Sequence, residues 1–258
     1  MTKHVNKIEV EIMSLKDAAN LYFNPGCALS IYRPENVKTI FDYLLKNFPE
    51  IEMHDICCRH DPKLPGGSVI INVCAGCGKR FGSLYDGVST ISLWEVIREL
   101  DNFPFPDYKG MEVSIHDPCP VRNEPGVHEA VRAILKKMKI RIVEAENIGT
   151  NSVCCGDSLY PSCDKEKILA AMKRRADSMP CENVAVYCVS CVKAMHIGGR
   201  VPRHLVDLLL GKATDPQECD IERWHNKLDA YIQTHNRHGE RGRQMTEDEI
   251  AVITNDAI

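Results

Sequence analysis

Short apolar runs alternate along the chain with longer amphipathic segments. Residues 21–23 are apolar and predict a strand that ends at Pro25 and Gly26. Apolar side chains then recur at helical spacing over 34–47, and Pro34 suits the first turn of the helix that this spacing predicts. Alternation of strand and helix in this way is typical of an α/β protein with a mainly parallel sheet.

The second half of the chain repeats the same order of strands and helices. Apolar runs predict strands over 111–115, 140–143 and 184–187, and an amphipathic segment predicts a helix over 125–138. Further predicted helices cover 93–97, 164–178, 205–209 and 221–232. We therefore expect two pseudo-symmetric Rossmann-like halves with short, mainly parallel sheets and cofactor sites at the strand ends.

These segments divide the chain into four parts. An N-terminal arm covers 1–20, where Ile8, Val10 and Ile12 alternate as in an edge strand. The two cysteine-rich halves cover 21–110 and 111–212, and a helical C-terminal tail covers 213–258. The tail is expected to dock on the body, support a homodimer or bind another protein.

Composition and charge narrow the class of protein. A chain of 258 residues with 44% hydrophobic content can bury two modest cores or one larger core. Its net charge of −4 gives no reason to expect binding to nucleic acid or to an anionic membrane. The first residues lack an apolar signal core, and no apolar run approaches about 18 residues, so we expect a cytoplasmic location without membrane insertion.

Ten of the thirteen cysteines form two sets with the same order, which is a single cysteine, an adjacent pair and a pair separated by two residues. This repetition indicates a duplicated cofactor-binding unit. The cysteines fall near predicted strand ends and helix starts, where backbone amides favour thiolates. The two sets are Cys27, Cys57, Cys58, Cys74 and Cys77, and Cys119, Cys154, Cys155, Cys188 and Cys191.

The pattern favours metal binding over disulfides. Adjacent cysteines have α-carbons about 3.8 Å apart, which is shorter than an unstrained disulfide prefers. Zinc and ordinary four-iron clusters commonly use four ligands, whereas each set offers five. No GxGxxG or Walker motif is present, so electrons are expected to come from another protein.

The cysteine motifs resemble a known family. The most specific pieces are residues 23–29 around Cys27, the complete second set with Cys154-Cys155-Gly156, and the duplication itself. Over about 21–211 the chain resembles the cysteine-rich CCG domain, which is found twice in the cysteine-rich subunit of heterodisulfide reductase. The same domain occurs in relatives associated with lactate, glycolate, glycerol 3-phosphate and succinate oxidation.

The resemblance implies one non-cubane [4Fe-4S] cluster for each set, bound through five cysteines. It implies that the clusters face a shared cavity, where a small disulfide is reduced or thiols are oxidised, in an anaerobic setting. Electrons would come from a flavoprotein or a ferredoxin-like partner protein. The cysteines given a catalytic role through cluster ligation are Cys57, Cys58, Cys154 and Cys155.

The first set departs from the family pattern. Cys58 is followed by Arg59 instead of glycine, and 15 residues separate Cys58 from Cys74, against 32 between Cys155 and Cys188. Residues 59–67 have the composition of a loop, so the first half lacks the helix predicted over 164–178. Zinc at the first site is therefore an alternative, and so is a non-catalytic zinc or iron-sulfur module that acts as a scaffold or in electron transfer.

Basic residues lie beside both sets. In one interpretation they attract an anionic substrate. In the other they offset the charge of the thiolates or form ordinary solvated surface. The four residues assigned to substrate binding are Arg59, Lys79, Lys193 and His196.

Overall fold

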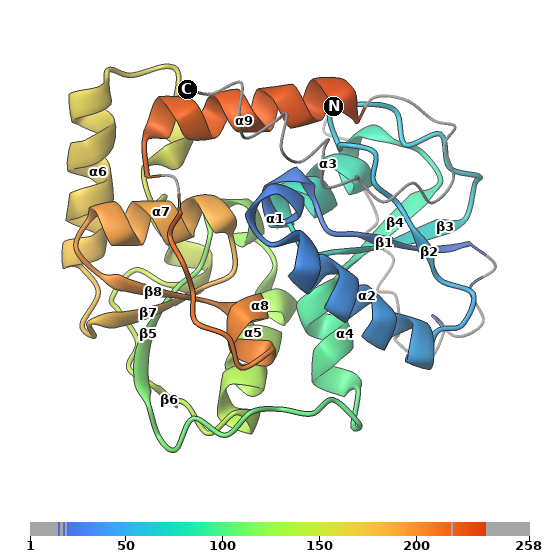
Figure 1. Ribbon diagram of the computed structural model, residues 1–258, viewed down its shortest axis with the longest axis horizontal. Coiled ribbons are helices and arrows are strands. Elements are labelled where there is room, and N and C mark those ends of the chain that lie inside the picture. Colours follow the sequence, from blue (N-terminus) through green and yellow to red (C-terminus); the bar gives the residue numbers. More distant parts are fainter. Residues whose placement is uncertain (1–14, 16–17, 19, 218, 236–258) are drawn as a thin grey trace.

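Both halves of the chain form a four-stranded parallel sheet, as the computed structural model shows for residues 15, 18, 20–217 and 219–235 (Figure 1). The first sheet has the order β2-β1-β3-β4 and the second has the order β6-β5-β7-β8, so the two orders are equivalent. This confirms the predicted α/β class with two related halves. The strands are β1 (Leu21–Asn24), β2 (Glu52–Met53), β3 (Ser68–Asn72), β4 (Val88–Ser92), β5 (Glu112–His116), β6 (Arg141–Ile142), β7 (Asn183–Val186) and β8 (Val201–His204).

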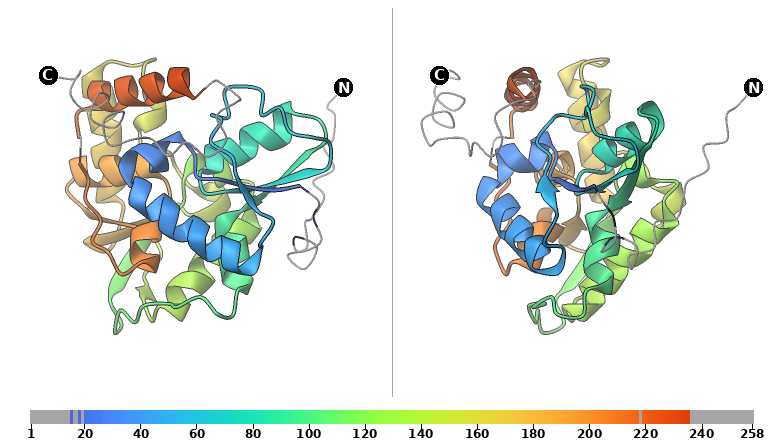
Figure 2. Two further views of the ribbon diagram at one scale, coloured as in Figure 1. Left: turned by 45° about the vertical axis from the view of Figure 1, so that its right-hand side comes forward. Right: turned by 90° about the vertical axis from the view of Figure 1, so that its right-hand side faces the viewer.

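Helices follow the strands in the same order in each half (Figure 2). The first half contains α1 (Cys27–Tyr32), α2 (Pro34–Asn47), α3 (Ala75–Leu84) and α4 (Leu93–Glu99). The second half contains α5 (Pro125–Lys137), α6 (Lys165–Asp177), α7 (Val189–Ile197), α8 (Leu205–Leu209) and the 3₁₀ turns η2 (Cys119–Val121), η3 (Gly149–Asn151) and η4 (Asp157–Leu159). The final described helix is α9 (Ile221–Thr234).

Local signals set several helix boundaries. Helix α2 has the predicted bounds and begins at Pro34, whose missing amide hydrogen is not needed there. Helix α4 begins with a capping box in which Ser92 and Glu95 satisfy each other's backbone amides. Asp164 accepts a hydrogen bond from the amide of Lys167 at the start of α6.

The two halves differ between the adjacent cysteine pair and the next strand. In the second half α6 fills this connection, whereas residues 59–67 of the first half contain neither helix nor strand. The predicted loss of this helix is confirmed. The first cysteine set therefore lacks the cover that α6 gives to the second.

One hydrophobic core joins the halves. It runs from Phe23 and Ile40 through α4 and α5 to Tyr187 and Leu205. Helices α4 and α5 approach closely at Gly126, where an added Cβ would lie 2.8 Å from a carboxylate oxygen of Glu95. Because burial of apolar surface is shared across this junction, the halves stabilise each other.

A buried polar network also crosses the junction. Tyr32 Oη donates to Asp207 Oδ2 at 2.9 Å, and Asn36 Nδ2 donates to Asp207 Oδ1 at 2.7 Å. Asp207 is fully buried. Both of its carboxylate oxygens are therefore paired by residues of the other half, which reduces the penalty for burying the group.

Helix α9 lies across the top of both halves in Figure 1, near α7 at one end and α3 at the other. Trp224 and Trp94 are buried, as expected for packing residues. No helix in the described part of the chain has both the length and the apolar character needed to cross a bilayer. The predicted edge strand near Ile8 lies outside the described residues, and the four domain boundaries stay a prediction.

Candidate metal centres

The cysteines lie at the carboxyl ends of the central strands. Cys27 starts α1 three residues after the end of β1, and Cys74 precedes α3 just beyond β3. In the second half Cys119 and Cys188 hold the corresponding places after β5 and β7. Parallel strands bring their carboxyl ends to one edge of the sheet, so residues distant in sequence meet there.

The five thiols of the first set form a continuous chain of contacts. Cys27 interacts with Cys57, Cys57 with Cys58, Cys58 with Cys77, and Cys77 with Cys74. The single cysteine and the spaced pair therefore lie at the two ends, joined by the adjacent pair.

The second set has the same order of contacts. Cys119 interacts with Cys154, Cys154 with Cys155, Cys155 with Cys191, and Cys191 with Cys188. All thirteen cysteines lie in the described part of the chain, and all are free thiols. In each half the structure thus brings together the five cysteines that the repeat singled out.

Contact between thiols divides them into proton donors and acceptors. Hydrogen bonds from Cys27 and then Cys58 lower the pKa of Cys57. In the second set, hydrogen bonds from Cys119 and then Cys155 lower the pKa of Cys154. A hydrogen bond from the Cys77 side chain lowers the pKa of Cys74 to about 7. Burial acts in the opposite direction, and the backbone amides of Cys77 and Gly76 lower the pKa further. When such thiols bind a metal ion, they release their protons and the metal cation takes the place of those protons.

Gly26 permits the close approach that assembles the first set. Its φ is +77°, and an added Cβ would lie 2.7 Å from Cβ of Cys74 and 3.4 Å from Sγ of Cys77. Glycine is therefore required both for the backbone conformation and for the space beside the thiols.

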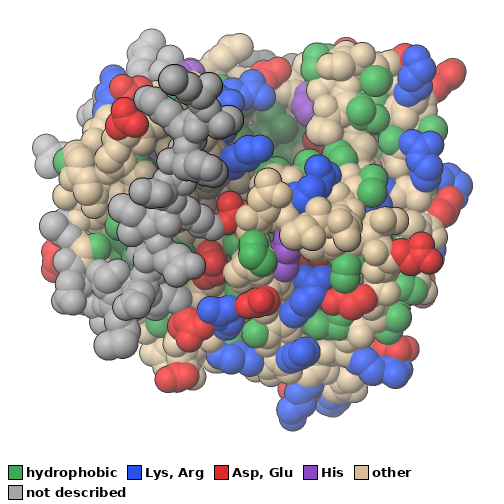
Figure 3. Space-filling model, turned by 180° about the vertical axis from the view of Figure 1, so that it is seen from behind, with side chains coloured by type: hydrophobic (Ala, Val, Ile, Leu, Met, Phe, Trp, Pro, Cys, Tyr) green, Lys and Arg blue, Asp and Glu red, His purple; other side chains and the backbone are tan. Residues whose placement is uncertain are grey.

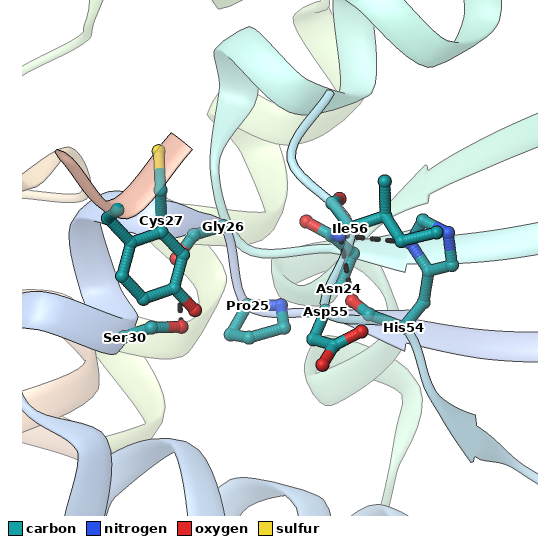
Figure 4. Close-up of a pocket in the computed structure, with 9 residues that line it drawn as sticks. Asn24, Pro25, Gly26, Cys27, Ser30, His54, Asp55 and Ile56 are labelled. Carbon is teal, nitrogen blue, oxygen red and sulfur yellow. Dashed lines mark hydrogen bonds between the residues drawn. The ribbon is translucent and has the colours of Figure 1, made fainter. Parts of the chain in front are cut away.

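A small pocket opens beside Cys27 (Figure 4). In this view Pro25 and Gly26 lie between Cys27 and Asn24, and Asn24 lies beside His54 and Ile56, to which it is hydrogen-bonded. Tyr231 of α9 completes the lining. Burial is the main cause that raises the pKa of Tyr231, so its phenol keeps its proton.

Asp117 holds the loop that carries Cys119. Its buried carboxylate accepts hydrogen bonds from Arg132 at 3.0 and 3.1 Å, from Tyr187 Oη at 2.6 Å and from the Gly149 amide at 2.7 Å. Burial alone would raise the pKa of Asp117, but Arg132 and these other donors hold it below its usual value. The carboxylate is therefore a fixed anchor for the segment before Cys119.

The residue after each adjacent pair has the same backbone role. The Gly156 amide donates to Cys154 Sγ at 3.4 Å, and the Arg59 amide lowers the pKa of Cys57 in the corresponding way. Gly156 has a φ of +109°, and an added Cβ would meet Met172 of α6 at 3.0 Å. Without α6, the first half has room for Arg59, whose exposed side chain pairs with Asp229 of α9 at 3.4 Å.

The four residues assigned to substrate binding are in different surroundings. Arg59, Lys79 and His196 are exposed, whereas Lys193 is buried. Lys193 Nζ lies 4.3 Å from the ring centroid of Trp224 and donates to the carbonyl of Pro216 at 3.1 Å. Their role in substrate binding stays a prediction.

Helix α9 contacts the surroundings of both sets. Near the second set, Trp224 Nε1 donates to Ser190 Oγ at 3.2 Å, and the ring of His225 stacks on Tyr160. Near the first set, the ring of His60 hydrogen-bonds to the carbonyl of Ile232 at 3.0 Å. The amphipathic pattern of the sequence predicts this helix, but the pattern carries no information on what the helix covers.

His116 and Arg175 were not among the predicted site residues. His116 lies at the end of β5, and one of its ring nitrogens lies within 4.8 Å of the sulfurs of Cys155 and Cys191. Burial, and next the charge of Arg175, lower the pKa of His116 to about 3. The sequence signal for His116 was its position three residues before Cys119, whereas nothing in the sequence pointed to Arg175 of α6.

The donor set of each site fits an iron-sulfur cluster. Each site supplies five sulfur atoms, including buried ones, and helix starts that favour thiolates. Zinc in a structural site takes four ligands, so a fifth sulfur in each contact chain exceeds what it needs.

Comparison with known proteins gives the class. Residues 113–196 match the model of the cysteine-rich CCG domain, a range that contains all five cysteines of the second set. The resemblance predicted from the sequence is confirmed for the second half of the chain, which is similar to this domain.

A curated relative is similar over most of the chain. It is a subunit of the fumarate reductase (CoM/CoB) of Methanothermobacter marburgensis, with 25% identity over 215 residues. The match covers 73% of this chain and 43% of that protein, so the chain spans less than half the length of the relative.

Proposed function

We propose that this protein is an iron-sulfur oxidoreductase subunit that reduces a disulfide, or oxidises thiols, at two non-cubane [4Fe-4S] clusters. The observation that carries the proposal is the identical order of the four contacts that link the five thiols in each set. The CCG domain and the similarity to a reductase subunit support it. All ten cysteines of the two sets act as ligands in this proposal.

The chain's own residues hold and shape the sites. Gly26 keeps the first set compact, and the anchored carboxylate of Asp117 fixes the segment before Cys119. Bound clusters supply the electron transfer that isolated thiols do not. Cys57, Cys58, Cys154 and Cys155 have their catalytic role through ligation.

Reduction of a disulfide consumes two electrons and two protons and yields two thiols. The electrons come from a flavoprotein or a ferredoxin-like partner, because the chain has no dinucleotide-binding fingerprint. The substrate is a small disulfide or thiol compound. Arg59, Lys79 and His196 are exposed cationic or basic groups suited to attracting an anionic one, whereas Lys193 reaches substrate only if its contacts with Trp224 and Pro216 open.

The remaining parts of the proposal concern the setting of the protein. In this proposal the protein acts in the cytoplasm under anaerobic conditions. It binds no nucleic acid and does not insert into a membrane, and the proposal is compatible with a homodimer. On the described face in Figure 3, positive and negative side chains are interspersed without a continuous field of one sign. This face therefore offers no electrostatic basis for binding a polyanion.

The test is iron, zinc and acid-labile sulfide per chain, measured on protein purified without oxygen. Two four-iron clusters give about eight iron atoms with matching sulfide. Cys154→Ser is expected to remove roughly half of the iron and to leave the first site occupied. Cys181→Ser is the matched control, because Cys181 lies outside both sets; equal iron in Cys154→Ser and the wild type would contradict the assignment.

A second candidate is a scaffold or electron-transfer module with zinc at the first site. The observations that favour it are Arg59 in place of glycine and the absence of a helix over 59–67. It predicts about four iron atoms and one zinc per chain. It also predicts that the protein, supplied with reduced electron donor, leaves a disulfide intact.

A further inference from the structure

His116 occupies a distinctive place beside the second set. It ends β5, is fully buried and pairs in register with Val186 of β7. One of its ring nitrogens, the sulfur of Cys155 and the sulfur of Cys191 all lie within 4.8 Å of one another. The imidazole is therefore part of the wall around the candidate metal centre.

Arg175 determines which nitrogen of His116 carries the proton. Arg175 Nε donates to His116 Nδ1 at 3.0 Å, while its other nitrogens donate to the Asn147 carbonyl and to Ser178 Oγ. A guanidinium has donors and no acceptor, so Nδ1 must present its lone pair. The proton of the neutral ring is therefore on Nε2.

The Nε2–H group of His116 has no hydrogen-bond partner among the described residues, although it is buried. A buried donor without a partner is costly, and such groups in native proteins call for an explanation. The sulfurs of Cys155 and Cys191 are the nearby groups that become strong acceptors when they ligate metal.

We propose that Nε2–H of His116 donates a hydrogen bond to a sulfur of the second metal centre and raises its reduction potential above that of the first. This rests on the proposed iron-sulfur function. A donor at a ligand sulfur withdraws negative charge and so favours the reduced, more negative state. The cationic Arg175 acts in the same direction, because its charge interacts with Cys155 and Cys191.

The first half has a different residue at the same place. Asn24 ends β1 three residues before Cys27, as His116 ends β5 three residues before Cys119. Asn24 Nδ2 donates to the carbonyls of His54 and Ile56 at 2.9 and 3.3 Å. Its remaining buried atom is Oδ1, which has no hydrogen-bond partner within the described part of the chain and can only accept.

The pseudo-symmetric sites therefore differ in polarity. A donor faces the second site from the strand end, whereas the equivalent residue of the first site has its donor engaged elsewhere. This difference makes the second site the one on which an electron rests and the first the one that passes it on.

The experiment is a redox titration of the metal-loaded protein, followed by absorbance and electron paramagnetic resonance. His116→Leu removes the donor and is expected to lower the potential of the second centre, with a roughly tenfold change in its one-electron equilibrium, or about 59 mV. His116→Gln, which can donate from a similar place, is expected to restore part of the shift. The first centre serves as an internal reference that neither variant changes.

A measurement on the wild-type protein covers the case in which His116→Leu fails to fold. With histidine labelled by ¹⁵N, the second centre should show a weak nitrogen coupling, as through a hydrogen bond, that is absent in His116→Gln. A strong coupling would mean direct ligation, and no coupling would mean no contact; either result overturns the proposal.

The outcomes also separate this inference from the proposed function. Wild-type protein without iron and sulfide contradicts the function itself. Two intact clusters whose potentials are unchanged in His116→Leu contradict only the role of His116. Loss of iron from the second site in a folded His116→Leu variant would make His116 a ligand and would likewise overturn its role as a donor.

Discussion

Gly26 and Gly67 both have positive φ values, +77° and +82°, but their surroundings differ. Nothing lies within 4 Å of a Cβ added at Gly67, whereas a Cβ at Gly26 meets the side chains of Cys74 and Cys77. At the residue scale, this pair separates the cost of backbone strain from the cost of filling the space beside the thiols.

We expect Gly26→Ala to lose the metal of the first site and Gly67→Ala to keep it. Both variants bear backbone strain of about 1–3 kcal/mol from a positive φ, but only Gly26→Ala pushes Cys74 away from its partners. Iron per chain and visible absorbance measure the difference. Similar losses in the two variants would show that strain alone, and not the close approach, is responsible.

At the scale of single elements, α6 and α9 distinguish the two sites. Helix α6 covers the second set and supplies Arg175, while the first half has a loop in its place. Helix α9 then reaches both sites, through Trp224 at one end and Tyr231 at the other. The cover of each site is thus made by different elements although the thiols have the same order.

Trp224 is the main anchor of α9. It is buried, contacts Lys193 through its ring and donates to Ser190. Trp224→Ala is expected to destabilise the protein by about 3–5 kcal/mol and to speed metal loss from the second site to a chelator.

The control for this prediction is Asp229→Ala on the same helix. It removes an exposed ion pair with Arg59, whose contribution is expected to be below about 1 kcal/mol. Urea midpoints and rates of metal release, measured without oxygen, compare the two variants. If Trp224→Ala released metal no faster than Asp229→Ala, α9 would not protect the second site.

At the scale of the whole molecule, the halves share one core and a buried junction. His204 of β8 is fully buried there, with its ring edge-on to Tyr32 of the first half at 5.8 Å between centroids. Burial lowers the pKa of His204 to about 3. Protonation of this residue therefore opposes the folded arrangement of both halves.

The pH dependence has a definite sign. In the unfolded protein the pKa of a histidine is near 6.5, and in the folded protein the pKa of His204 is about 3. The full stability is therefore present above about pH 6.5, and it is lost as the pH falls from there toward 3. Between pH 8 and pH 5.5, His204 alone should lower the free energy of unfolding by about 1.4 kcal/mol. His204→Gln should reduce the decline by that amount.

Urea midpoints of the metal-loaded protein at several pH values measure this effect. His196→Gln replaces an exposed histidine and is the matched control. A decline of equal size in His204→Gln and the wild type would rule out His204 as the source.

The prediction of α2 shows what local sequence can specify. Apolar spacing and Pro34 are properties of adjacent residues, and the structure has the helix with the predicted bounds. The strands β2, β3, β4 and β8 were not identified. All four are short, and polar residues such as Ser89 and Arg203 interrupt β4 and β8, whereas β3 contains an apolar run over 69–71 that could have predicted it. Short elements depend on their neighbours more than on their own pattern.

The sequence by itself determined the α/β class, the duplication and the membership of the ten cysteines in two sets, because periodicity and spacing are written along the chain. Only the tertiary structure decided the order of contacts within each set, the cover that α9 provides and the meeting of His116 with Arg175 and the thiols. Tyr32 and Asp207, for example, are 175 positions apart and meet through one hydrogen bond. Such contacts follow from the packing of whole elements, which leaves no periodic signal in the sequence.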